Sequence, residues 1–177
     1  MTAPKKIRLS YSKLNSFANY DKHEAIAIIL GKQIPSTPEM ELGTLAHKII
    51  EDEKLDVEGL GPGGEYETKG VVELYDWLDF SFVIDRYKDG VLVDYKTGRG
   101  DPMQLYVYAF LLALQDKPVH EGRLVYVNID PCTKEVTKRS QRKYPIGQDE
   151  LKLGWSWIDE TSHEIKDILD GINYGWM

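Results

Sequence analysis

Two short apolar segments joined by Asp89-Gly90 constrain the fold of this chain more than any other feature. The segments are residues 80–88 (FSFVIDRYK) and 91–96 (VLVDYK). An Asp-Gly pair favours a two-residue turn, because both central residues of that turn need a positive φ angle. The sequence therefore predicts an antiparallel hairpin in which Lys88 faces Val91 and, further along the strands, Asp85 faces Asp94.

Asp85 and Asp94 would place two carboxylates on one patch of this hairpin. Residues directly opposite each other point to the same face, and both aspartates lie in apolar runs that predict burial. Two buried like charges are costly unless one is protonated or a cation lies between them. Lys96 projects from the same face as Asp94. The patch suits Mg²⁺ or Mn²⁺ with a lysine that stabilises charge on a phosphate, and spacing alone leaves a simple salt bridge from Lys96 to the aspartates equally open.

Helical and strand patterns flank the hairpin on both sides. Helices are predicted over residues 10–20, 25–30, 42–54, 103–115 and 148–169, strands over 66–74, 122–130 and 135–144, and loops over 31–39 and 59–64. The helix 103–115 can act as a crossover that brings residues 122–130 back parallel to the hairpin. The prediction is an α/β protein with a central mixed β-sheet flanked by helices.

Length and charge limit the class of protein. A chain of 177 residues suits a single domain, and its net charge of −7 argues against a protein that coats nucleic acid by bulk electrostatics. Any contact with nucleic acid must be local, as residues 134–143 could provide, although a solvated edge strand protected by charge explains them equally well. No apolar run approaches the roughly 20 residues of a membrane span, and no secretory signal is evident. We therefore expect a cytoplasmic protein without a membrane partner.

Two of the predicted helices carry further polar candidates. His47 and Glu51 are four residues apart and share one face of the helix 42–54. Gln104 and Tyr108 share a face of the apolar helix 103–115. A lone histidine on a helix is usually a surface or core-edge residue, and a glutamine at a helix start can simply be exposed. The second helix begins shortly after Lys96, however, so its first turns can lie close to the carboxylate patch.

Five motifs, taken in order, resemble the PD-(D/E)XK nuclease superfamily in its RecB-like branch. They are residues 9–17 (LSYSKLNSF), 43–51 (GTLAHKIIE), 82–86 (FVIDR), 93–98 (VDYKTG) and 104–108 (QLYVY). The resemblance implies a single nuclease domain over residues 1–177, with residues 9–115 carrying the motifs. It also implies a restriction-endonuclease-like core and metal-dependent hydrolysis of DNA phosphodiester bonds.

The resemblance assigns metal-binding and catalytic roles to five residues. His47, Asp85 and Asp94 would ligate the metal ion, together with the backbone carbonyl of Tyr95. Asp85, Asp94 and Lys96 would be the catalytic residues, and the lysine would neutralise charge that develops on the phosphate.

The resemblance also implies contacts with the substrate. Gln104 and Tyr108 would shape the site and touch the DNA backbone. Apart from the resemblance, the distribution of basic residues suggests two more contacts: Arg86 and Arg99 flank the proposed site and could bind the DNA backbone.

The implied cofactor is Mg²⁺ or Mn²⁺. A histidine among oxygen ligands suits Mn²⁺ as well as Mg²⁺. The iron–sulfur subgroup of this branch uses four cysteines, whereas Cys132 is the only cysteine of this chain. We therefore expect no iron–sulfur cluster.

The function implied by the resemblance is a DNA exonuclease of recombination, repair or phage DNA processing, in a bacterial or phage-infected cell. A catalytically inactive DNA-binding or adaptor domain with the same fold is the alternative, although intact Asp85, Asp94 and Lys96 argue against it. A third possibility is an unrelated α/β domain whose hairpin charges form salt bridges. DNA is the implied partner. A second copy of the chain, or a recombination or replication protein, is a further candidate that the sequence does not identify.

Overall fold

The computed structural model describes residues 6–174, which form two compact units. One unit comprises residues 6–34, 70–82 and 155–174, and the other comprises residues 35–69 and 83–154. All predicted site residues belong to the second unit. The assignment of residues 1–177 to one domain stays a prediction.

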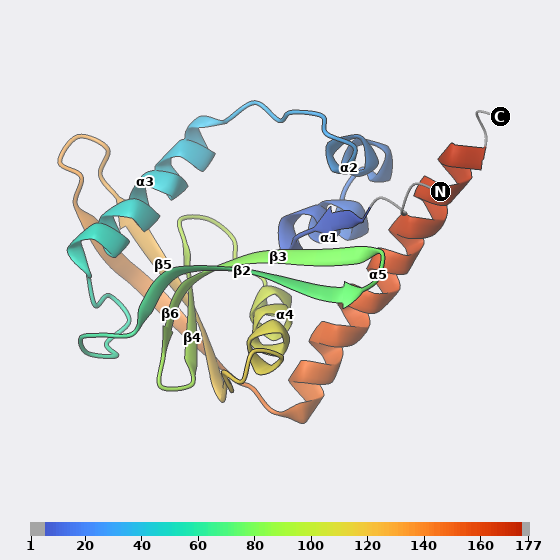
Figure 1. The fold of residues 1–177 in the computed structure, drawn as a ribbon. Coiled ribbons are helices and arrows are strands. Elements are labelled where there is room, and N and C mark those ends of the chain that lie inside the picture. The colour runs from blue at the N-terminus through green and yellow to red at the C-terminus, as the bar shows by residue number, and fades with distance from the viewer. Residues whose placement is uncertain (1–5, 175–177) are drawn as a thin grey trace. The chain divides into compact units, whose positions relative to one another are not determined.

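The described residues form five helices and six strands (Figure 1). They are β1 (Ile7–Leu9), α1 (Tyr11–Asn19), α2 (Lys22–Ile29), α3 (Pro38–Glu53), β2 (Glu65–Tyr75), β3 (Leu78–Lys88), β4 (Val91–Lys96), α4 (Pro102–Ala113), β5 (Glu121–Ile129), β6 (Val136–Pro145) and α5 (Gln148–Tyr174). Within the described residues, six strands form one mixed sheet in the order β1-β3-β4-β5-β6, with β2 paired to β3. The predicted α/β class, with a mixed sheet and helices, is confirmed. None of the described helices combines the length and the apolar character needed to cross a membrane.

The turn of the hairpin and the strand pairs next to it form as the sequence predicts. Asp89 and Gly90 have φ angles of 49° and 79°, and Lys88 pairs with Val91. The segment before β5 packs against this turn. The backbone N–H of His120 donates a hydrogen bond to the Gly90 carbonyl at 2.9 Å. β5 then pairs parallel to β4 after the crossover helix α4, and β6 pairs antiparallel to β5 at the edge of the sheet.

β4 is buried on both of its faces. Its odd-numbered residues pack against Ala46 and Ile50 of α3; they are Val91, Val93 and Tyr95. The even-numbered residues point to the opposite face, because side chains alternate along a strand; they are Leu92, Asp94 and Lys96. On that face α4 lies close to the sheet, and a Cβ atom built at Gly122, the partner of Leu92, would lie 3.0 Å from the Leu105 side chain. β4 therefore presents the Asp94 and Lys96 side chains to α4.

Two helices begin earlier than the sequence predicted. α3 begins at Pro38, inside the predicted loop 31–39, because Thr37 caps the helix by accepting a hydrogen bond from the Met40 N–H. Proline suits the first position of a helix, where its missing N–H is not needed. α2 begins at Lys22 because the Asp21 side chain accepts hydrogen bonds from the next turn. The sequence also missed β1, and α5 runs beyond its predicted end to Tyr174.

The unit formed by residues 6–34, 70–82 and 155–174 has its own core. β1 pairs parallel with the start of β3 and buries Leu9. α1 buries Leu14 and Phe17. Tyr75 and Trp77 stack with ring centres 5.2 Å apart.

Gly154 lies close to the backbone of α4. A Cβ atom at Gly154 would lie 2.5 Å from the carbonyl oxygen of Tyr106. We expect Gly154→Ala to lower the free energy of unfolding by about 1–3 kcal/mol, because the clash outweighs the gain in helix propensity. Urea denaturation measures this change. Gly171→Ala is the matched control in the same helix, since nothing lies within 4 Å of that position. It should stabilise the protein by up to about 1 kcal/mol, and equal effects at both positions would contradict the close approach.

Candidate active site

Lys96, at the end of β4, is held in place from two sides. Its Nζ atom lies 2.8 Å from Asp94 Oδ2 and donates a hydrogen bond to Gln104 Oε1 at 2.8 Å. Gln104 donates in turn from Nε2 to the Tyr108 hydroxyl at 3.2 Å. The two α4 residues are one turn apart and so reach the same point. These contacts fix the position of the Lys96 ammonium group.

Burial and charge act in opposite directions on Asp94 and Lys96. Asp94 is 3% exposed, and this burial raises the pKa of Asp94 even though the Lys96 ammonium opposes the shift. Burial also disfavours the charged form of Lys96, but the carboxylates of Asp94 and Asp85 outweigh it and raise the lysine's pKa. Lys96 therefore carries a positive charge at neutral pH.

A histidine and two carboxylates form a second cluster. His47 Nδ1 lies 3.3 Å from Asp85 Oδ1 and 3.9 Å from Glu67 Oε1. One ligand atom from each of these three residues lies within 4.8 Å of the other two. Burial alone lowers the pKa of His47, but the neighbouring Asp85 and Asp94 carboxylates raise it to about 9. The imidazole is therefore protonated at neutral pH, and its Nε2–H donates to the Tyr95 carbonyl at 2.9 Å.

Asp85 connects this cluster to β4. Its Oδ1 atom faces His47, and its Oδ2 atom accepts a hydrogen bond from the backbone N–H of Tyr95 at 2.7 Å. The described pairs between β3 and β4 end at Arg86 and Val93. The direct pairing of Asp85 with Asp94 is therefore replaced by this hydrogen bond. Tyr95 is flanked by Asp94 and Lys96, so the two groups of side chains adjoin.

The donor set fits a hard divalent cation. An imidazole nitrogen and carboxylate oxygens are ligands that Mg²⁺ and Mn²⁺ accept. Burial and the nearby Asp85 charge raise the pKa of Glu67, so a cation would relieve repulsion between these carboxylates. Asp94 Oδ2 is buried and, apart from its ion pair with Lys96, meets no hydrogen-bond partner among the described residues. A cavity of about 390 Å³ leads to His47 and Glu67 from the exposed side of α3.

Glu67 is a candidate site residue that the sequence analysis missed. It lies in β2 with a φ angle of 46°, an uncommon value for a residue other than glycine. β2 pairs with β3, which lays its first residues beside the end of β3 that carries Asp85. The two strands are joined at Asp76-Trp77, which is not one of the dipeptides that indicate a hairpin turn, so no local pattern in the sequence indicates this pairing.

The structure does not bring Arg86 to this site. Arg86 is fully buried and points to the face opposite Asp85, because neighbouring residues of a strand alternate. Its guanidinium contacts the Asp56 and Glu58 carboxylates and donates to the carbonyls of Gly61 and Gly63 at 2.5 and 2.7 Å. We therefore leave Arg86 out of the residues proposed to contact DNA.

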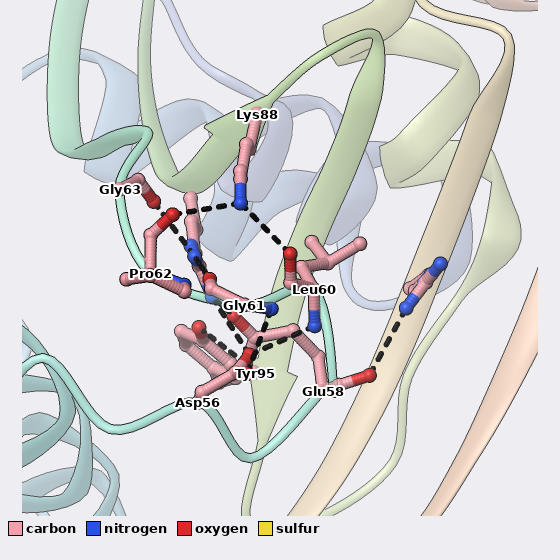
Figure 2. A network of polar contacts seen from close by, with 10 residues as sticks. Asp56, Glu58, Leu60, Gly61, Pro62, Gly63, Lys88 and Tyr95 are labelled. Carbon is pink, nitrogen blue, oxygen red and sulfur yellow. Dashed lines mark hydrogen bonds and ion pairs between the residues drawn. The ribbon is translucent and has the colours of Figure 1, made fainter.

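Arg86 is part of a network that fixes the loop before β2. Lys88 Nζ donates to the carbonyls of Leu60 and Pro62 at 2.8 and 2.7 Å (Figure 2). Glu58, at 2% exposure, accepts a hydrogen bond from the Tyr95 hydroxyl at 2.9 Å. The predicted loop 59–64 is confirmed, and basic side chains from the sheet bind its carbonyl groups.

Arg99 lies in the loop between β4 and α4. Its side chain is exposed and lines a cavity with Arg139 and Arg142. Its predicted contact with DNA stays a prediction.

The sequence matches no protein-family model and no curated protein. Solved structures are similar in fold. A protein from Eubacterium rectale provisionally assigned as an exonuclease has 12% sequence identity and a TM-score of 0.67, over 93% of this chain and 82% of its own. LHK-Exo in complex with dAMP has 12% sequence identity and a TM-score of 0.54, over 97% of this chain and 95% of its own.

A second structure of LHK-Exo, the alkaline exonuclease of Laribacter hongkongensis, has 11% identity and a TM-score of 0.53, over 94% of both chains. At these identities the likeness is one of fold. The chain therefore shares the fold of these exonuclease structures.

Proposed function

We propose that the protein is a divalent-metal-dependent deoxyribonuclease, and specifically an exonuclease, that hydrolyses DNA phosphodiester bonds. The observation that carries the proposal is the position of Lys96. Its ammonium group is held by Asp94 and Gln104 beside a cluster of groups suited to a cation. The order of the five sequence motifs and the fold likeness to exonucleases support the same activity, and the preference for DNA ends rests on them alone.

The residues proposed to hold Mg²⁺ or Mn²⁺ are His47, Asp85, Asp94 and the Tyr95 carbonyl, and we add Glu67. The chemistry that such a cation supplies when bound is positive charge beside the phosphodiester and a lower pKa for water. Binding of a cation requires His47 to lose its proton, because a metal ligand must offer a free lone pair.

Lys96 acts directly on the substrate in this proposal, and the side chains around it hold it in position. Lys96 remains charged and neutralises the negative charge that develops on the phosphate in the transition state. Gln104 fixes the direction of the ammonium group, and Tyr108 fixes Gln104. We further propose that the protein acts on DNA in recombination, repair or phage DNA processing in the cytoplasm.

Degradation of end-labelled DNA tests the proposed function. Purified protein is incubated with linear single-stranded DNA, linear duplex DNA and closed circular DNA, in Mg²⁺, in Mn²⁺ and in chelator. We expect loss of linear DNA with either metal ion, no loss in chelator and no loss of circles. Rapid cleavage of circles would contradict an exonuclease. Binding of DNA without cleavage under any condition would instead indicate the adaptor domain.

A further inference from the structure

A basic cavity lies next to the candidate active site. It has a volume of about 530 Å³ and lies between the loop after β4 and the strands β5 and β6. Its lining side chains are Arg99, Tyr126, Arg139, Ser140 and Arg142, and the rest of the lining is two glycines, Gly98 and Gly100. No carboxylate lines it, although the chain as a whole has a net charge of −7.

The strand register places this cavity on the face that carries Asp94 and Lys96. Lys96 pairs with Tyr126, which pairs with Ser140. In the neighbouring row Asp94 pairs with Leu124, which pairs with Arg142. Paired residues point to the same face of a sheet. β4 and β6 are two strand spacings apart, or roughly 10 Å, so the basic cavity lies within reach of a strand bound at Lys96.

A β-bulge turns Arg139 into this cavity. The register between β5 and β6 shifts after Tyr126, so that Arg139 is an extra residue without a partner on β5. Bulges redirect side chains in this way. The Arg139 guanidinium carbon lies 5.4 Å from the centre of the Tyr126 ring, and the Arg139 side chain joins Arg142 in the lining.

The three arginines are available to bind an anion. Across the part of the chain that the structure describes, none of the ion pairs involves Arg99, Arg139 or Arg142. A guanidinium group matches the geometry of a phosphate with two parallel hydrogen bonds. Gly100 keeps the cavity open toward Lys96, because a Cβ atom there would lie 3.1 Å from the Tyr126 hydroxyl and 3.3 Å from Lys96 Cγ.

We propose that this cavity binds a backbone phosphate of the DNA strand that is cut, about two or three nucleotides from the bond beside Lys96. The separation follows from the roughly 10 Å between β4 and β6 and the rise of about 3.4 Å per nucleotide in a B-form strand. This inference rests on the proposed nuclease function. It assigns the phosphate to Arg139 and Arg142 of β6 and to Arg99 of the loop after β4.

DNA binding by charge-matched variants tests the cavity. Affinity for a fluorescent single-stranded oligonucleotide is measured by anisotropy in Ca²⁺, over a range of salt concentrations. We expect Arg142→Gln to weaken binding about tenfold and to lower the salt dependence by about 0.7 in log–log slope. Lys143→Gln removes the same charge from the neighbouring residue, which pairs with Arg123 and points to the other face, and should change affinity less than about twofold.

Neutral linkages locate the phosphate. A methylphosphonate placed at one position at a time should weaken binding to wild type most at one position near the cleavage site, and that position should lose its effect in Arg142→Gln. Equal losses in Arg142→Gln and Lys143→Gln, or no position that depends on Arg142, would overturn the inference. If the wild-type protein binds and degrades DNA and Arg142→Gln binds DNA with the same affinity, only the phosphate site is refuted and the proposed nuclease function stands. If wild type neither binds nor degrades DNA, the proposed function fails and the inference with it.

Discussion

Lys96→Met is expected to slow DNA cleavage by about 10³-fold, the size of effect seen when a group that stabilises transition-state charge is removed. Methionine keeps the length of the side chain but cannot supply the positive charge that Asp94 and Gln104 hold in place. DNA affinity should stay within about threefold of wild type, because most of it comes from other phosphate contacts. Single-turnover rates in Mg²⁺ and in Mn²⁺, measured beside binding in Ca²⁺, separate the two effects.

Two further variants show whether the loss comes from the charge of Lys96. Gln104→Leu leaves the lysine in place but removes one of its two anchors, so a smaller loss of about tenfold is expected. Lys152→Met, on the exposed side of α5, should cleave like wild type. Lys96→Met protein that is folded by circular dichroism and cleaves at the wild-type rate would remove the catalytic role of this residue.

Arg86→Met is expected to lower the free energy of unfolding by about 3–5 kcal/mol, as is usual when one partner of a buried ion pair is removed. Arg86 is 0% exposed and Glu58 is 2% exposed, so the variant leaves the Glu58 carboxylate buried without its partner. The loop carbonyls of Gly61 and Gly63 lose their donors as well. Urea denaturation followed by circular dichroism measures the change.

The double variant Arg86→Met/Glu58→Met tests whether the unpaired Glu58 carboxylate causes this loss of stability. Removing both charges should recover part of the stability, because no unpaired buried charge remains. Arg142→Met, an exposed arginine on β6, should change the stability by less than about 0.5 kcal/mol. A loss of similar size in Arg142→Met and Arg86→Met would contradict the structural role of Arg86.

The parts of the fold that follow local rules could be predicted from the sequence. Asp89-Gly90 sets the register of the hairpin through the φ angles of two adjacent residues, and α4 has room to return β5 parallel to β4. The prediction of a loop at Pro38 was wrong, because a proline can either interrupt a helix or occupy its first position. The cap formed by Thr37 shows that Pro38 begins α3. β1 has three residues and exists only through its pairing with Leu78–Phe80, so no local pattern indicates it.

The site divides in the same way. The period of two along β4 correctly put Lys96 beside Asp94, and helix spacing put Gln104 beside Tyr108. The position of Glu67 beside Asp85 depends on the pairing of β2 with β3 and on the positive φ angle of Glu67. The residues around Glu67 in the sequence indicate neither. The same period of two separates Arg86 from Asp85, and applying it would have shown that only one of them can face the site.

The contact between the hairpin turn and His120 limits where homologues of this protein can carry insertions or deletions. Inserting or deleting one residue between the turn and Asp94 would exchange the two faces of β4 and move both Asp94 and Lys96 to the side of α3. A hairpin turn is often where extra residues are accommodated, but Gly90 accepts a hydrogen bond from His120 and a side chain at Gly90 would collide with the His120 ring. Residues 85–96 are therefore a segment of fixed length, and additions are better tolerated at the exposed connection between β5 and β6.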